Sequence, residues 1–390
     1  MQVQGYGVND VFRTMVRTIH NASIEQKISN VEHGAWREPP LLIRNSRNGK
    51  VIQVVEPVTV TYLTPQSRVL LNTKRDANPF FHVFEALWML SGSKEVTPLS
   101  YYVGRMLSFS DDGQTLNGAY GYRWRNAEVK RSQQEFSVRQ RIDQLNLLVQ
   151  HLRADNDSRR AVLQMWNVED DLLRIGTACE VDVLDASADV CCNLCCVFQV
   201  RSDASTKWLD MTVFNRSNDM IWGMLGANLV HFSFLQEYIA ARIGAEVGRM
   251  HQVTANLHVY TDNWEPEEWL SVYGDEDSDK EFAYPNLSHD TFIPILGKDE
   301  DPELFDQEVS EFIGRNGDSI IDRGPYVSQF LQRVAMPMCN AYKLHKQRDY
   351  KEALKTVDML TPPDWRKAAW EWLKRREAMW DSNKTGAYLT

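Results

Sequence analysis

The segment 226–243, GANLVHFSFLQEYIAARI, is strongly apolar over a helical length, and it constrains the fold more than any other part of the chain. A helix that is apolar on most of its circumference is buried among other elements. Runs rich in β-branched and apolar residues at 51–62, 161–166, 191–201 and 208–214 predict strands. The sequence therefore predicts a central helix within a layered core.

Helical spacing of apolar residues predicts further helices on both sides of these strands. They are expected at residues 8–30, 79–91, 134–154, 326–347, 349–360 and 364–379. The amphipathic face of the segment 134–154 would consist of Ile142, Leu145, Leu148, Val149 and Leu152. Because strands and helices alternate irregularly, we expect an α+β fold with mixed α/β layers.

The composition changes after Tyr260. The 390-residue chain has a net charge of −10, and residues 261–310 alone contain sixteen Asp or Glu against two Lys. We interpret this stretch as a solvated surface insertion rather than a binding site. The sequence thus predicts a core of residues 1–260 and an acidic insertion with a helical C-terminal appendage over 261–390.

Charge and hydropathy exclude several classes of protein. A negative net charge argues against a protein that binds duplex nucleic acid. No run approaches the roughly 18 apolar residues of a membrane helix. The first residues, MQVQGYGVND, lack the charged and apolar regions of a signal peptide. We expect a soluble cytoplasmic protein with neither nucleic-acid nor membrane partners.

Four of the six cysteines lie in the run 191–196 and do not resemble a disulfide framework. Cys192-x-x-Cys195 has the spacing of half a zinc site or of a redox pair, yet no second ligand pair is apparent. The surrounding run, VCCNLCCVFQV, predicts a buried strand in which most thiols are small core residues. We expect no metal site, and one of these thiols is a candidate nucleophile.

Two polar segments at the ends of predicted elements are candidates for ligand binding. Arg159 and Arg160 are adjacent guanidinium groups that suit a phosphate or a carboxylate, or else a solvated turn. The segment 214–219, FNRSND, concentrates polar groups at a strand end, as a ligand-binding edge does.

Four further residues are candidates for a chemical role, and two of them, Asn228 and Glu85, also have a structural interpretation. Asn228 begins the apolar helix, where an amide can also serve as a cap. His258 and Tyr260 alternate along a strand and share a face. Glu85 lies within an apolar helix, which predicts either a buried ion pair or an acid–base group.

Together these segments resemble the thymidylate synthases and their hydroxymethylase relatives, over most of residues 40–260. The matching motifs are Cys191-Cys192-Asn193 for the active-site Pro-Cys-His, RSND at 216–219 followed by Asn228, His258-Val259-Tyr260, Arg159-Arg160, Glu85-Ala86-Leu87-Trp88, Tyr120-Gly121 with Trp124-Arg125, and Arg47. Seven motifs in the family's order make the resemblance specific.

The resemblance implies a thymidylate-synthase-like fold, in which large twisted sheets stack back to back in a homodimer. It implies transfer of a one-carbon unit from 5,10-methylenetetrahydrofolate to C5 of dUMP through a covalent adduct of Cys192. The implied catalytic residues are Cys192, Glu85, Asn193, Tyr120 and Asp219. The implied nucleotide-binding residues are Arg47, Arg159, Arg160, Arg216, Ser217, Asn228, His258 and Tyr260, with Arg159 and Arg160 lent to the partner subunit. The implied folate-binding residues are Trp88, Asp219, Met106 and Phe109.

Departures from the synthase pattern bear on the product. Asn193 and Cys191 replace the His and Pro beside the nucleophile, and Met106 and Phe109 stand where synthases carry a tryptophan pair. The last residues, GAYLT, lack the synthases' apolar tail. A wetter site lets water, rather than hydride, end the reaction. We therefore expect a phage-like dUMP hydroxymethylase, with a thymidylate synthase as the alternative and an inactive homologue as a more remote one.

Overall fold

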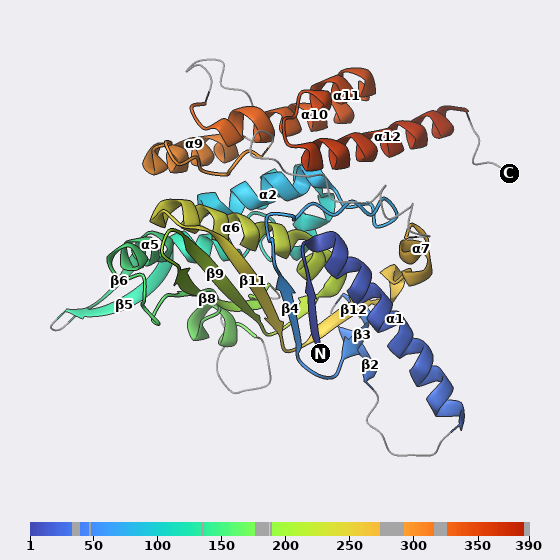
Figure 1. Ribbon diagram of the computed structural model, residues 1–390, viewed down its shortest axis with the longest axis horizontal. Helices are drawn as coiled ribbons and strands as arrows, with labels where there is room; N and C mark the ends of the chain where they lie inside the picture. Colours follow the sequence, from blue (N-terminus) through green and yellow to red (C-terminus); the bar gives the residue numbers. More distant parts are fainter. Residues whose placement is uncertain are drawn as a thin grey trace.

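The computed structural model describes residues 1–32, 40–46, 48–133, 136–175, 187, 189–273, 292–315 and 326–385. In these residues a mixed sheet is covered by two buried helices, and a further layer of C-terminal helices lies over them (Figure 1). This is the layered α+β architecture that the sequence predicts.

The large sheet has six strands in the order β1-β4-β11-β9-β8-β7. Their bounds are β1 Gln2–Gly5, β4 Val58–Tyr62, β7 Val162–Gln164, β8 Asn193–Ser202, β9 Lys207–Asn215 and β11 Glu246–Thr254. The ladders place Asn193 opposite Asn215, and Asn215 opposite Thr254. The start of β8 and the ends of β9 and β11 therefore meet at one edge of the sheet.

A smaller sheet in the order β10-β12-β3-β2 continues from this edge. It comprises β2 Leu41–Ser46, β3 Gly49–Val54, β10 Asn218–Asp219 and β12 Leu257–Tyr260. The parallel pairing of β10 with β12 sets Asp219 beside His258. Two polar segments that are far apart in the sequence are thus brought together by strand pairing.

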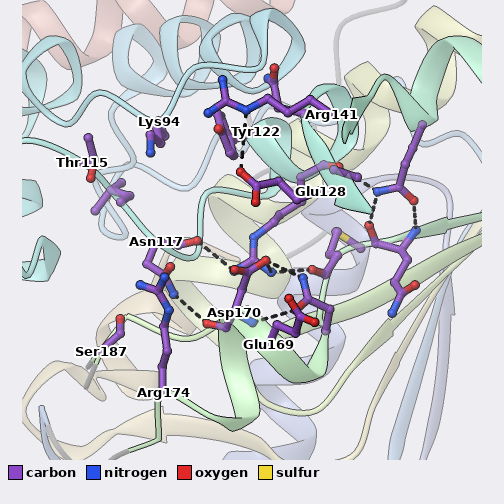
Figure 2. A pocket seen from close by; sticks show the side chains of 18 of the residues that line it. Lys94, Thr115, Asn117, Tyr122, Glu128, Arg141, Glu169, Asp170, Arg174 and Ser187 are labelled. Atoms are coloured by element: carbon purple, nitrogen blue, oxygen red, sulfur yellow. Dashed lines mark hydrogen bonds and ion pairs between the residues drawn. The ribbon is translucent and has the colours of Figure 1, made fainter. Parts of the chain in front are cut away.

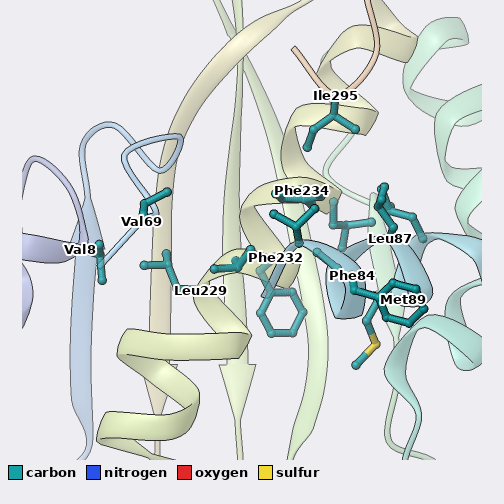
Figure 3. Close-up of a cluster of buried hydrophobic side chains, with 14 of the residues drawn as sticks. Val8, Val69, Phe84, Leu87, Met89, Leu229, Phe232, Phe234 and Ile295 are labelled. Atoms are coloured by element: carbon teal, nitrogen blue, oxygen red, sulfur yellow. The ribbon is translucent and has the colours of Figure 1, made fainter. Parts of the chain in front are cut away.

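One buried helix packs on a face of the large sheet, and a second buried helix packs on the first. In α6 (Asn228–Ile243) thirteen residues are buried, and in α2 (Pro79–Ser91) twelve are buried. Asn78 caps the start of α2 by accepting bonds from Phe80 and Phe81, and Gly92, with φ of 73°, ends it. Side chains of both helices meet in one hydrophobic cluster (Figure 3).

The other face of the large sheet is less covered. Along β9, Leu209, Met211 and Val213 are fully buried, whereas the alternating Thr212 and Phe214 are partly exposed. The same alternation occurs along β11. Successive strand residues point to opposite faces, so one whole face of the sheet is partly open in the single chain.

The remaining helices surround the core. They are α1 Val8–Glu32, α3 Thr97–Tyr102, α4 Tyr120–Arg125, α5 Gln144–Ala154, α7 Pro266–Ser271, α9 Pro302–Gly314, α10 Met336–Lys346, α11 Tyr350–Asp358 and α12 Pro363–Thr385, with short turns η1 Gly104–Phe109, η2 Val168–Leu172, η3 Met220–Ala227, η4 Thr261–Asn263 and η5 Leu331–Ala335. No helix in the described part of the chain is long and apolar enough to cross a membrane.

The C-terminal helices α9 to α12 form the layer above α2 (Figure 1). Phe80 of α2 lies 5.4 Å from Trp372 of α12, measured between ring centroids. Asp306 of α9 accepts a 2.9 Å bond from Arg125, the last residue of α4. The C-terminal layer is thus attached to the core through both α2 and α4.

One sequence prediction about a helix was wrong, and one long helix was missed. Residues 136–142 do not begin a helix: they form strand β6 (Phe136–Ile142), paired with β5 (Ala127–Gln133). The helix begins only at Gln144, where Asp143 accepts a capping bond from Asn146. The acidic helix α9 was not predicted, because its charges masked the apolar face formed by Phe305, Val309 and Phe312.

A close approach between α4 and α2 yields a prediction for stability. A Cβ atom at Gly121 would lie 2.0 Å from the backbone oxygen of Met89. We expect Gly121→Ala to lower the free energy of unfolding by about 1–3 kcal/mol, because a helix backbone has to move. Chemical denaturation measures the change. Gly314→Ala, which meets no atom within 4 Å, is the control and should leave stability nearly unchanged; equal losses in both variants would contradict the argument.

Candidate active site

Cys192 lies directly before β8 and is partly exposed. Its neighbours Cys191 and Cys196 are buried, and burial raises the pKa of both thiols. Burial also raises the pKa of Cys195, which is only partly covered. The five cysteines in the described part of the chain are free thiols. Cys192 is therefore the accessible thiol at the sheet edge where polar groups gather.

A guanidinium group lies beside this thiol. Nη2 of Arg216 is 3.7 Å from Sγ of Cys192, and it donates a 2.9 Å bond to the carbonyl of Val190. Nε of Arg216 donates to the carbonyl of Cys191 over 2.8 Å. These bonds hold the Arg216 guanidinium against residues 190–192, the nucleophile segment. A cation at this distance favours the thiolate form of Cys192 over the thiol.

A buried ion pair between Arg123 and Asp171 supports the nucleophile segment. Arg123 donates to both carboxylate oxygens of Asp171, over 2.9 and 3.3 Å. The same carboxylate accepts a 3.0 Å bond from the backbone N–H of Cys191. Asp189 accepts from the backbone N–H of Gly118 over 2.9 Å. The backbone before Cys192 is thus held by two carboxylates from different segments.

A chain of amides orients Asn228 at the start of α6. Its Nδ2 donates to Oδ1 of Asn218 over 3.0 Å, and Asn218 donates to Gln252 over 3.3 Å. Gly223 leaves room for these amides, because a Cβ there would lie 2.2 Å from Oδ1 of Asn218. No other partner of the Asn228 amide is found among the described residues, and its second N–H and its oxygen have the donor and acceptor pattern that complements a cyclic amide.

Hydroxyl and imidazole groups form a second polar edge on β12. Ser217 Oγ lies 3.5 Å from Nδ1 of His258, and the rings of His258 and Tyr260 meet edge to face at 5.5 Å. All three side chains are within the small sheet or at its margin. With Arg216 they form a cluster of donors of the kind that binds a phosphorylated sugar.

Asp219 caps the turn η3 by accepting bonds from the backbone N–H groups of Ile221 and Trp222. Burial raises the pKa of this carboxyl, and the nearby His258 and Arg75 oppose the shift. The guanidinium of Arg75 stacks over the ring of Trp222, 4.1 Å from its centroid. Trp222 is half exposed, so this side of the site presents a flat aromatic surface.

The buried carboxylate of Glu85 is paired with an imidazole. Oε2 of Glu85 lies 2.9 Å from Nε2 of His231, and their side chains are 7% and 2% exposed. Tyr120 is close to the thiols: burial raises its phenol pKa, and Cys192 and Cys191 add to the shift. Asn193 is fully buried, and neither amide atom has a partner in the described part of the chain.

Several predicted site residues lie elsewhere or allow another role. Trp88 is fully buried and its indole donates to the carbonyl of Glu95, so its folate contact stays a prediction. Met106 and Phe109 lie in η1 and are partly exposed. Arg159 and Arg160 are exposed at the turn before β7. Arg47 and the tail 386–390 lie outside the described residues.

A polar cavity of about 950 Å³ is lined by residues of η2, β5 and β6, among others, and by none of the predicted site residues. Figure 2 shows Lys94, Arg141 and Arg174 around it together with Glu128 and Asp170. Its charges partly pair with one another: Arg141 lies 3.7 Å from Glu128. In the described residues, no three His, Cys, Asp or Glu side chains cluster closely enough to hold a metal ion.

Sequence reasoning missed three residues at this site: His231, Asn218 and Arg75. His231 follows Asn228 by three positions, so both lie on one face of α6, and this spacing was an available signal. Asn218 lay within the recognised polar segment. Arg75 had no signal, because its stacking on Trp222 depends on the tertiary fold.

Comparison with known proteins agrees with this arrangement. The family model of thymidylate synthase matches residues 41–271. A deoxyuridylate hydroxymethyltransferase of Pseudomonas phage M6 is 40% identical over 359 residues, which cover 88% of this chain and 90% of that protein. A deoxyuridylate hydroxymethyltransferase of Bacillus phage SP01 is 37% identical over 58% of this chain and 56% of its own length. A thymidylate synthase of Corynebacterium aurimucosum is 30% identical over 52% of this chain and 67% of its own length. The family match over more than half of the chain, and the 40% identity to a relative covered almost end to end, show that the chain belongs to the thymidylate synthase family.

Proposed function

We propose that this protein is a dUMP hydroxymethylase that uses 5,10-methylenetetrahydrofolate as cosubstrate. The observation that carries the chemistry is the 3.7 Å contact between the Cys192 thiol and the Arg216 guanidinium at the edge of the sheet. The hydroxymethyl product is supported by two similar phage proteins, which are named deoxyuridylate hydroxymethyltransferases. The same site with hydride as the last reactant would be a thymidylate synthase, which is the alternative.

The residues divide the work between binding and reaction. Arg216 and Ser217 bind the phosphate, and His258 and Tyr260 contact the sugar. Asn228 donates to O4 of uracil and accepts from N3–H. The thiolate of Cys192 adds to C6, which makes C5 nucleophilic, and a positioned thiolate is a good attacking and leaving group. Tyr120 and Asn193 lie beside this centre, and Asp219 presents its carboxyl to the folate.

The folate supplies the one-carbon unit at the oxidation level of formaldehyde. The exposed face of Trp222, stacked on Arg75, fits a flat heterocycle beside Asp219. After transfer, loss of the C5 proton and of tetrahydrofolate leaves an exocyclic methylene group on C5 of the nucleotide. Water adds to this carbon and gives the 5-hydroxymethyl product, without any oxidant or reductant.

The functional unit we propose is a homodimer formed through the partly open face of the large sheet. Ala161, next to Arg160, accepts a bond from Phe198, which is six residues beyond Cys192 along β8. At about 3.3 Å per residue, Arg160 is roughly 20 Å from the nucleophile of its own chain. From this position, Arg159 and Arg160 would reach a phosphate beside Cys192 of a second subunit rather than one beside Cys192 of their own chain.

The first prediction concerns the product and the nucleophile. The native protein should convert dUMP and methylenetetrahydrofolate to 5-hydroxymethyl-dUMP, and Cys192→Ser should lower turnover at least about 10³-fold, because a hydroxyl is a far weaker nucleophile. Mass spectrometry of the products measures both. Cys195→Ala is the matched control and should keep most activity. Thymidylate as the main product would instead establish the synthase, and an active Cys192→Ser would remove Cys192 as nucleophile.

The second prediction tests the shared site. Cys192→Ser and Arg160→Ala homodimers should both be nearly inactive. Mixed dimers contain one site in which both residues are native, so mixing should restore up to half the native activity per heterodimer. Two differently tagged chains, co-purified and assayed, give the measurement. Stable mixed dimers without recovered activity would show that each site is complete within one chain.

The third prediction concerns the base. Asn228 matches the donor and acceptor order of uracil, and cytosine reverses it. A mismatched buried polar pair costs about 1–3 kcal/mol, so kcat/KM for dUMP should exceed that for dCMP at least about tenfold. Asn228→Asp should narrow or invert this preference. Ser217→Ala is the control and should lower kcat/KM for dUMP and for dCMP by the same factor. A native preference for dCMP would refute the assignment of the base.

A further inference from the structure

The Glu85–His231 pair joins the two helices that cover the sheet. Glu85 lies in the middle of α2, and His231 lies in the first turn of α6. In the described part of the chain, the imidazole is the hydrogen-bond partner of this carboxylate, with Oε2 and Nε2 2.9 Å apart. A buried carboxylate needs such a partner to remain ionised. The orientation of Glu85 therefore depends on one residue of the opposite helix.

Neighbouring residues connect the pair to Asn228 and to Cys192. His231 is one turn after Asn228 on the same helix face. The next residue, Phe232, stacks on Tyr120 with ring centroids 6.3 Å apart, and Tyr120 is electrostatically coupled to Cys192. Phe232 and Phe84, the chain neighbours of His231 and Glu85, belong to one hydrophobic cluster (Figure 3). The Glu85 carboxylate therefore lies next to a well-packed part of the core.

The neighbouring groups leave His231 as the partner of the carboxylate. His82, one turn before Glu85, is buried, and burial, with Arg75 and His231, lowers its imidazole pKa to about 3. It is neutral near pH 7 and adds no charge to the pair. Arg75 is occupied with Trp222 and the carbonyl of Ile221. The second ring nitrogen of His231, Nδ1, is buried without a partner in the described residues, and Nε2 is the ring nitrogen that contacts the carboxylate.

We propose that His231 is a positioning residue for the water that ends the reaction. Its Nε2–H holds the Glu85 carboxylate in the orientation that accepts a proton from this water. This role rests on the proposed hydroxymethylase function and deepens it: the pair would decide how fast water captures the methylene intermediate.

The step balances without another reactant. The water oxygen forms a bond to the exocyclic carbon, and one water proton moves to Glu85. The electron pair of the methylene double bond enters the ring as an enolate. The enolate then restores the C5–C6 double bond, the C6–S bond breaks, and Cys192 leaves as thiolate.

The test uses two polar variants that differ in reach. The amide nitrogen of Gln can stand near the place of Nε2, whereas that of Asn stands near Nδ1 and cannot reach Glu85. The exocyclic methylene group is an electrophile, so added 2-mercaptoethanol competes with water and gives a thioether. The ratio of thioether to 5-hydroxymethyl product therefore reports the water step alone, and mass spectrometry measures it at one fixed thiol concentration.

We expect His231→Asn to raise this ratio at least about tenfold and His231→Gln to keep it near the native value. The dissociation constant for dUMP, measured by calorimetry without folate, should stay within about threefold in both variants, because Arg216 and Asn228 are intact. His345→Asn is the control: His345 is a buried histidine of α10, and its loss should not change the ratio.

The outcomes separate this role from the function on which it rests. An unchanged ratio in a folded His231→Asn protein with lowered kcat would assign His231 a structural role only and overturn the inference. An equal rise in the Asn and Gln variants would also overturn it, because reach would not matter. If the native protein forms thymidylate and no 5-hydroxymethyl product, the proposed function itself fails together with the inference.

Discussion

The complete burial of α2 constrains the rest of the molecule. One side of this helix packs on α6, and the other side is covered by α9, α10 and α12 (Figure 1). A carboxylate inside such a helix costs several kcal/mol unless it is paired. The chain meets this cost with His231, and the pairing fixes how α2 and α6 are aligned. The C-terminal helices therefore support the site although none of the predicted site residues lies in them.

Strand pairing brings the other half of the site together. Cys192, Arg216 and the β12 residues follow or precede strands that end at the same edge of the large sheet. Their geometry does not depend on long loops. The nucleophile segment has no regular structure of its own, so Asp171 and Asp189 hold it through the backbone groups of Cys191 and Gly118. Because this segment is already ordered before substrate binds, less conformational entropy is lost in reaching the transition state.

Much of this fold could be predicted from the sequence because its strongest patterns are periodic. The helices at 8–30 and 79–91 were predicted within two residues, since their apolar spacing is regular. The prediction failed at 136–142, where strand β6 is followed almost directly by α5, so that the apolar residues of the strand were read as part of the helical pattern. It also missed α9, where exposed acidic residues hide the buried stripe. The polar segment before Asn228 was recognised by its motif, whereas the amide chain through Asn218 required the folded arrangement.

His231 shows why a site is harder to predict than a fold. A single histidine in an apolar helix has the same pattern whether it is a core residue or a functional one. Only the partner from α2 distinguishes the two, and no spacing in the sequence relates positions 85 and 231. In this family, the fate of the methylene intermediate depends on which reactant reaches it first. A dry site favours hydride, and a site with a carboxylate held by a buried imidazole favours water. The same contact that stabilises the core can therefore select the product.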